Sequence, residues 1–235
     1  MFSILRPYIF SLDPEAAHDL AIKSLKVNIL PKSFFSVSNE EMLETKLFNK
    51  KISNPVGLAA GFDKSAEVYN SLFKFGFGFI EVGTVTPKPQ LGNPKPRIFR
   101  LEKDQALINR LGFNNHGLDA ISERISNNYP DGFLGINIGP NKETKNKEED
   151  YYTCLSKLSR HAGYITINIS SPNTEGLRNF HDQNQMKKLL SGLNKIKKEK
   201  KINQPIAIKL SPDIDDKEIS KIIELVKSQN IQGII

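Results

Sequence analysis

The sequence predicts an α/β fold in which parallel strands alternate with helices, and three observations support this. From Asn54 onward, short runs of β-branched and apolar residues alternate with longer stretches of helical periodicity. Polar residues and glycines follow the strand candidates, as they do at the carboxyl edge of parallel sheets. No Gly-x-Gly-x-x-Gly motif follows a strand candidate, so a (β/α)8 barrel is favoured over an open doubly wound sheet.

Six strand candidates and five helical stretches account for most of the chain after residue 54. Strands are expected at residues 55–59, 78–82, 133–138, 164–169, 205–210 and 231–235. Helices are expected between them, at about residues 66–75, 117–126, 150–161, 185–200 and 216–229. Such alternation implies parallel strands with helical crossovers. Because a closed barrel of this kind has eight strands, we expect an incomplete (β/α)8 TIM barrel of about six.

The first 45 residues differ from the rest, and we expect a small helical extension (1–45) followed by the partial barrel (46–235). Asp13 can cap a helix that begins with Pro14 and runs to about Val27. One interpretation is a helix packed on its own domain. The other is a small hairpin of helices that lies on a membrane or admits an apolar ligand.

Composition excludes several classes of protein. A length of 235 residues and an apolar content of 38% suit a globular chain rather than a disordered one. The sequence contains no run of 18 apolar residues, the length that a helix needs to cross a bilayer. No small-residue cleavage site follows the first apolar stretch, so a secretory signal is not expected. The lone Cys154 excludes an internal disulfide framework and suits a reducing compartment.

A net charge of +7 and a pI near 9.3 raise the question of nucleic-acid binding. Much of the excess lies in Lys187, Lys188 and residues 195–201, where apolar residues interrupt the lysines at helical spacing. This pattern is typical of the solvated face of a helix, and no interleaved aromatic residues accompany it, so we expect no nucleic-acid partner. We also expect no metal, because metal-ligand spacing is absent from the four histidines, His18, His116, His161 and His181.

Polar side chains gather after the strand candidates. Two small residues and Gly61 would let the backbone approach a flat ligand, and Lys64 adds a cation. Hydroxyl, carboxamide and ammonium groups follow at the later strand ends, in Thr84, Asn137, Asn168, Ser171, Asn173 and Lys209. Taken singly, each has an ordinary explanation as a turn residue or an ion pair. Together they suit a planar, anionic ligand rich in heteroatoms better than a metal ion.

Five segments resemble the dihydroorotate dehydrogenases, which are FMN enzymes of pyrimidine synthesis built on a (β/α)8 barrel. They extend over much of the chain and are Leu58–Lys64, Glu81–Pro87, Gly92–Arg97, Asn109–Asn114 and Asn168–Thr174. The chain is most similar to the quinone-dependent, membrane-associated class. That class has a serine where the soluble class has a cysteine, and Ser171 stands at this position. It also has an N-terminal helical extension, which Leu12–His18 resembles.

The resemblance implies that (S)-dihydroorotate is oxidised to orotate, with Ser171 taking the proton from C5 while hydride leaves C6 for the flavin. The residues implied to contact FMN are Ala60, Gly61, Phe62, Asp63, Lys64, Thr84, Asn137, Asn168 and Lys209. Those implied to hold the substrate are Lys64, Asn109, Arg110, Leu111, Gly112, Phe113, Asn168 and Asn173. His18 and Arg100 resemble the polar pair that lines the family's quinone tunnel.

The resemblance also implies a monomer bound peripherally to the cytoplasmic side of the cell membrane, with a membrane quinone as electron acceptor. The family continues through two further βα units beyond the position of Ile235, including loops for the FMN phosphate, so we expect this chain to be part of a longer protein. Two alternatives remain. One is another FMN barrel, such as a tRNA dihydrouridine synthase, against which the serine loop and the N-terminal extension argue. The other is a truncated chain without activity.

Overall fold

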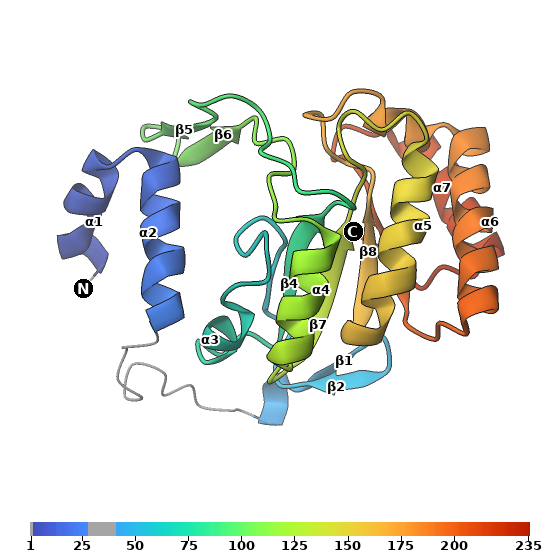
Figure 1. Cartoon of the computed structure of the whole chain (residues 1–235), viewed down its shortest axis with the longest axis horizontal. Helices are drawn as coiled ribbons and strands as arrows, with labels where there is room; N and C mark the ends of the chain where they lie inside the picture. Colours follow the sequence, from blue (N-terminus) through green and yellow to red (C-terminus); the bar gives the residue numbers. More distant parts are fainter. Residues whose placement is uncertain (1, 28–40) are drawn as a thin grey trace.

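The computed structural model describes residues 2–27 and 41–235, and its centre is a six-stranded parallel sheet (Figure 1). The strand order is β10-β9-β8-β7-β4-β3, and all five pairings are parallel. The bounds are β3 (Gly57–Leu58), β4 (Phe79–Val85), β7 (Phe133–Ile138), β8 (Tyr164–Asn168), β9 (Ile206–Lys209) and β10 (Gly233–Ile234). Each of the six predicted strands is therefore confirmed, with ends that differ by a few residues.

The sheet is curled. Gly57 at one edge and Gly233 at the other line the same cavity of about 810 Å³, together with Glu81, Tyr164 and Ala207 from the strands between them. Two edges of a flat sheet of six strands could not share a cavity of this size, because neighbouring strands lie about 4.8 Å apart. The concave face is therefore the inner wall of an incomplete barrel, as the sequence predicts.

Helices cover the convex face (Figure 1), where α4 packs beside α5, α5 beside α6 and α6 beside α7. The bounds are α3 (Tyr69–Phe73), α4 (Leu118–Asn127), α5 (Lys147–Leu158), α6 (Gln183–Lys200) and α7 (Asp216–Ser228), with short 3-10 turns at Ser159–His161 and Leu177–His181. These confirm the five predicted helical stretches. Two of the helices begin at aspartates whose carboxylates accept backbone N–H groups: Asp182 from Asn184 and Gln185, and Asp215 from Glu218.

Strand β8 illustrates how the sequence divides the two faces of the sheet. Ile165 and Ile167 are fully buried in the core between the sheet and the helices, where each contributes roughly 1.5–3 kcal/mol to stability. The alternate residues Tyr164, Thr166 and Asn168 have their side chains on the other face, toward the barrel interior. Alternation along one strand therefore places apolar groups in the core and polar groups at the interior.

Two helices precede the sheet and stand beside it as a hairpin, α1 (Phe2–Ser11) and α2 (Pro14–Val27) (Figure 1). The predicted cap is confirmed, since the Asp13 carboxylate accepts the backbone N–H groups of Glu15 at 2.9 Å and Ala16 at 3.0 Å. Among the described residues, no helix is both long and apolar enough to traverse a bilayer. Residues 28–40 lie outside the described part of the chain, so the division into 1–45 and 46–235 stays a prediction.

Two antiparallel hairpins were not predicted from the sequence. One joins β1 (Thr45–Leu47) to β2 (Lys50–Ile52), and the other joins β5 (Ile98–Leu101) to β6 (Ala106–Asn109). The first turns through Phe48 and Asn49 at positive φ values of 49° and 64°, without the glycine that usually marks such turns. The strands have only three or four residues each and little alternation, so they lack the pattern that identifies a strand. Figure 1 shows the two hairpins at opposite ends of the sheet.

Candidate active site

The carboxyl ends of the strands surround a cavity of about 180 Å³, which we call the rim cavity. It is lined by Ala60, Gly61, Lys64, Gly83, Thr84, Asn109, Leu111, Gly112, Phe113, Asn114, Asn168, Ser171, Asn173 and Lys209. All of these except Gly83 and Asn114 were predicted from the sequence to contact FMN or the substrate or to take the proton. The decisive observation is that Ser171 and Lys64, which are 107 positions apart in the chain, line the same cavity. Two hydroxyls, two cations and several amides therefore meet at one place.

Four of the residues predicted to contact FMN or the substrate do not line the rim cavity, and two of them follow Gly61. Phe62 lines a second cavity beside α2, described below. Asp63 is buried, and its carboxylate accepts the backbone N–H groups of Glu67 at 2.7 Å and Val68 at 2.8 Å, which precede α3. Burial raises the pKa of Asp63, and these two donors act in the opposite direction. In the structure, Asp63 therefore shapes the loop that carries Lys64.

Arg110 and Asn137 are the other two. The guanidinium of Arg110 donates to the carbonyl of Pro96, from Nε at 3.1 Å and from Nη2 at 2.9 Å, so it holds the proline-rich loop of residues 87–97. Asn137 has no exposed surface and lies behind the rim cavity, where its Oδ1 accepts from Thr84 Oγ1 at 2.7 Å and from Asn168 Nδ2 at 3.1 Å. It therefore supports two lining residues.

Ser171 lies in the loop that follows β8, and this loop is shaped by hydrogen bonds from side chains to nearby backbone. The backbone N–H of Asn173 donates to Ser171 Oγ at 3.1 Å. Asn168 Oδ1 accepts from both the N–H and the hydroxyl of Ser170, at 3.1 and 2.8 Å. Within the described residues, no acceptor is found for the Ser171 hydroxyl hydrogen. The N–H group beside Oγ would stabilise negative charge that develops on it.

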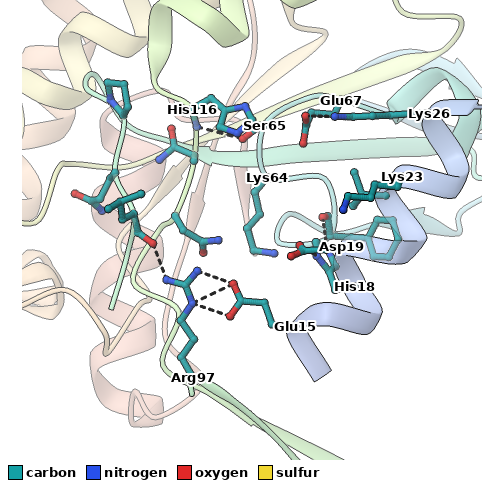
Figure 2. Close-up of a pocket in the computed structure, with 17 residues that line it drawn as sticks. Glu15, His18, Asp19, Lys23, Lys26, Lys64, Ser65, Glu67, Arg97 and His116 are labelled. Atoms are coloured by element: carbon teal, nitrogen blue, oxygen red, sulfur yellow. Dashed lines mark hydrogen bonds and ion pairs between the residues drawn. The ribbon is translucent and has the colours of Figure 1, made fainter. Parts of the chain in front are cut away.

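Lys64 is one of the two cations of the rim cavity, with Lys209, and it also lines the second cavity. Figure 2 shows its side chain extending toward Glu15 and Asp19 of α2. Burial lowers the pKa of Lys64, while the negative charges of Glu15 and Asp19 act in the opposite direction. The ammonium group is therefore poorly solvated, which strengthens its attraction for an anionic ligand.

The backbone near Lys64 leaves room for a flat ligand. Gly61 has a φ of 113°, and a Cβ placed there would meet nothing within 4 Å, so the glycine opens onto free space. Gly83 has a φ of 112°, and a Cβ there would lie 2.4 Å from the carbonyl oxygen of Asn137. Both positions thus favour glycine, one by conformation alone and one also by close packing. With the surrounding amides and ammonium groups, this lining fits a planar heteroaromatic ligand that carries negative charge.

A second cavity, of about 560 Å³, lies between α2 and the carboxyl end of the sheet (Figure 2); we call it the helix cavity. Ile22 and Phe62 give it apolar wall, and the predicted His18 lines it. His18 Nε2 lies 2.7 Å from the carbonyl oxygen of Phe62, and the two rings meet edge to face. Because Lys64 lines both cavities, the helix cavity adjoins the rim cavity.

Arg100, the predicted companion of His18, does not line the helix cavity. Its Nη1 donates to the carbonyls of Phe10 at 3.1 Å and Leu12 at 2.7 Å, at the end of α1. Its guanidinium also lies 4.8 Å from the centre of the Phe10 ring. Arg100 therefore links β5 to the end of α1 and does not share a cavity with His18.

A buried ion pair fastens α2 over the helix cavity. Arg97 donates to Glu15 from Nη2 at 2.6 Å and from Nε at 3.0 Å (Figure 2). Its Nη1 donates to the carbonyls of Leu91 at 2.6 Å and Asn93 at 2.8 Å. The hydrogen bond from Arg97 is the main reason that the pKa of Glu15 is lowered. One guanidinium thus holds the proline-rich loop and the first turn of α2 together.

Replacing Glu15 by alanine is expected to destabilise the protein by about 3–5 kcal/mol, because it leaves the buried Arg97 charge without its carboxylate. Amide hydrogen exchange in α2 should accelerate more than exchange in α4 to α7, as measured by mass spectrometry. Lys95→Ala is the matched control, because Lys95 also pairs with Glu15, at 3.4 Å, but its side chain is 63% exposed. Equal effects of the two variants would contradict the anchoring role.

The ion pair of Glu15 and Arg97 also predicts how the stability of the folded protein changes with pH. Because the pKa of Glu15 is lower in the folded protein than in the unfolded chain, the pair contributes fully above the unfolded pKa. This contribution is lost as the pH falls through the lowered pKa. Thermal unfolding from pH 6 downward should therefore show a smaller acid loss in Glu15→Ala than in the parent chain.

In the part of the chain that the structure describes, no three His, Cys, Asp or Glu side chains are grouped so that they could hold a metal ion. The rim cavity itself offers the hydroxyls of Ser171 and Thr84, the ammonium groups of Lys64 and Lys209, and neutral amides. Such a set can bind and orient an anionic heterocycle and can accept a proton from it.

The chain matches known proteins over its whole length. A family model described as dihydroorotate dehydrogenase matches residues 42–235. Proteins named dihydroorotate dehydrogenase (quinone) from Christiangramia forsetii and Aliivibrio fischeri are each 46% identical, over 99% and 100% of this chain and 71% and 72% of theirs. Two solved structures of DHODH from Eimeria tenella are 37% identical. The one in complex with ferulenol has a TM-score of 0.88 and the ligand-free one 0.86, and the chain covers 65% and 68% of them.

Proposed function

The chain belongs to the dihydroorotate dehydrogenase family, and from this premise we propose that it oxidises (S)-dihydroorotate to orotate at the rim cavity, with FMN as its flavin and a quinone as electron acceptor. The names of the relatives support both the reaction and the acceptor, and this reaction belongs to pyrimidine synthesis. The observation that carries the proposal is that Ser171, Lys64 and the amides of Asn109, Asn168 and Asn173 line one cavity.

Ser171 is proposed to take the proton from C5 of dihydroorotate. A serine hydroxyl is a weak base at its ordinary pKa, so the developing charge must be stabilised. The N–H of Asn173 beside Ser171 Oγ supplies one stabilising donor. The poorly solvated Lys64 ammonium supplies a positive charge on the same cavity wall. We propose that Lys64 and the amides of Asn109 and Asn173 hold the orotate ring and its carboxylate.

FMN is proposed to lie against the small and amide-bearing residues of the rim cavity, namely Ala60, Gly61, Thr84, Asn168 and Lys209. The open space beside Gly61 and the lack of charge on Thr84 and Asn168 support a flat, neutral ring system there. When bound, FMN accepts hydride from dihydroorotate and delivers electrons to the quinone. The protein residues orient the two ligands and keep water from them.

The helix cavity is proposed as the quinone site. Its apolar wall of Ile22 and Phe62, the polar His18 and its junction with the rim cavity at Lys64 support this assignment. We further propose that residues 1–45 form a unit that rests peripherally on the cytoplasmic face of the membrane, and that the protein is a monomer. Exposed apolar side chains on α1, on α2 and in the turn between them support membrane contact, at Leu5, Tyr8, Leu12 and Leu20.

The test is to follow the two half-reactions separately with the purified, FMN-loaded protein. Dihydroorotate should bleach the flavin absorbance in stopped-flow, and a soluble quinone analogue should restore it. Dihydrouridine-containing tRNA should do neither; reduction linked to that RNA would instead support a dihydrouridine synthase. Bleaching without reoxidation by the quinone would contradict the assigned acceptor, and no bleaching would contradict the proposed reaction.

A further inference from the structure

Glu81 is a carboxylate in the interior of the sheet, and the proposed reaction does not use it. It lies in β4 among apolar residues and is 4% exposed. Three side-chain donors converge on it: Asn137 Nδ2 at 2.8 Å on Oε1, and Thr166 Oγ1 at 2.6 Å and Tyr164 Oη at 3.0 Å on Oε2. The donors come from β7 and β8, so one side chain of β4 joins three neighbouring strands.

The strand between Glu81 and Tyr164 is built to allow this contact. Glu81 is paired with Gly135 of β7, and Gly135 is paired with Tyr164 of β8. A Cβ at position 135 would lie 2.2 Å from the Tyr164 ring and 2.5 Å from its hydroxyl. The glycine therefore lets the tyrosine side chain cross β7 and reach the carboxylate on the far strand. Burial and donation to Glu81 both raise the pKa of Tyr164, so its hydroxyl stays protonated and remains a donor.

The Glu81 carboxylate accepts all three of these hydrogen bonds, and this fixes the direction of the bonds beyond it. Asn137 must turn its Nδ2 toward Glu81, which leaves its Oδ1 to accept from Thr84 Oγ1 at 2.7 Å and from Asn168 Nδ2 at 3.1 Å. Thr84 Oγ1 in turn accepts from Asn168 Nδ2 at 3.0 Å. Asn168 Oδ1 is then left to face Ser170, one residue before Ser171.

We propose that Glu81 is a positioning residue: its carboxylate sets the orientation of the Asn137 amide, and through it the polar groups that Thr84 and Asn168 present to the rim cavity. The inference rests on the proposed function, since it concerns the ligands of that cavity. Stability alone does not explain a charge at this position, because burying a carboxylate costs several kcal/mol and an apolar residue would fill the same space. Either orientation of the Asn137 and Asn168 amides would be possible without a fixed acceptor.

The test is an exchange of acid and amide between positions 81 and 137. Asn137→Asp alone places two carboxylates where a 2.8 Å hydrogen bond now lies, and it should weaken FMN binding by more than about a hundredfold. Glu81→Gln alone should weaken it about tenfold, because the new amide can take either orientation. In the double variant E81Q/N137D, the amide nitrogen introduced at position 81 donates to the carboxylate introduced at position 137, and every donor from Tyr164, Thr166, Thr84 and Asn168 keeps an acceptor. The double variant should therefore bind FMN at least tenfold better than Asn137→Asp.

FMN affinity is measured by fluorescence titration, and folding is measured by thermal unfolding of the flavin-free proteins. Tyr164→Phe is the matched control: it removes one donor from Glu81 without touching Asn137, so it should lower the unfolding temperature while changing FMN affinity by less than about threefold. If the losses of FMN-binding free energy in Glu81→Gln and Asn137→Asp simply add in the double variant, the proposal is contradicted. A loss of FMN affinity in Tyr164→Phe equal to that in Glu81→Gln would also contradict it. If Asn137→Asp does not fold, recovery of a folded double variant is the expected result, and its failure to fold contradicts the proposal.

The parent chain separates this inference from the proposed function. If the parent binds FMN and its flavin spectrum shifts on addition of orotate, the function of the rim cavity stands whatever the variants do. If the parent neither binds FMN nor shows this spectral shift with orotate, the result contradicts the proposed function itself. Additive losses in a parent that binds both ligands contradict only the role of Glu81.

Discussion

Replacing Ser171 by alanine is expected to slow flavin reduction by dihydroorotate by about a hundred- to ten-thousandfold, the range in which a positioned acid or base contributes to a rate. The variant removes the only atom of this side chain that can accept the C5 proton, and it adds no bulk to the rim cavity. FMN binding should be nearly unchanged, because the residues proposed to hold the flavin lie at the ends of β3, β4, β8 and β9 rather than in the serine loop. Stopped-flow absorbance under anaerobic conditions measures the reduction, and fluorescence titration measures the affinity for FMN.

The neighbouring serine supplies a matched control. Ser170 donates to Asn168 Oδ1 at 2.8 Å and is not part of the cavity lining, so Ser170→Ala loses one hydrogen bond behind the site. We expect it to slow reduction by no more than about tenfold, in keeping with the net value of a neutral hydrogen bond. If the two variants reduce the flavin at similar rates, or if Ser171→Ala reduces it as fast as the parent, Ser171 is not the base that takes the C5 proton.

Much of the site could be predicted from the sequence because of how a parallel sheet is arranged. Residues at or just after the carboxyl ends of β3, β4, β8 and β9 are far apart in the chain, but the carboxyl ends of parallel strands meet at one edge. The positions of the strands in the sequence are therefore enough to predict that Lys64, Thr84, Asn168 and Lys209 lie close together. The strands themselves were recognisable because they are apolar, β-branched and bounded by turn residues.

The contacts that join separate layers could not be predicted in this way. Glu15 and Arg97 are 82 residues apart, and each has a sufficient local explanation, as a first-turn acid and as a loop arginine. Local pattern also gave no reason to separate Arg100 from His18. Glu81 did leave a signal, a charged residue inside an otherwise apolar strand, but its partners Tyr164 and Thr166 are fixed by register between strands. Register depends on the whole sheet rather than on any one segment.

Replacing Lys64 by methionine is expected to move stability and ligand binding in opposite directions. Methionine keeps a similar length but has no charge, so the variant loses the cation that we propose faces the orotate carboxylate. Losing one partner of a desolvated charge pair costs about 2–5 kcal/mol, which corresponds to a loss of orotate affinity of about thirtyfold to several thousandfold. The affinity is measured from the change in flavin absorbance on titration with orotate. Lys23→Met is the control, because Lys23 is an exposed lysine of α2 that does not line the rim cavity.

Stability should respond with the opposite sign, because burial lowers the pKa of Lys64 below its ordinary value of 10.5. Between the lowered pKa and the ordinary one, the unfolded chain binds more protons than the folded protein, so stability rises with pH across that window. Below the window the full cost of burying the ammonium group is present, and Lys64→Met removes that cost. The flavin-free variant should therefore unfold at a higher temperature than the parent at pH 7, and the difference should shrink as the pH approaches 10. A variant that is less stable at pH 7 and still binds orotate normally would show that Lys64 is a structural residue, and the proposed anion site would have to be placed elsewhere.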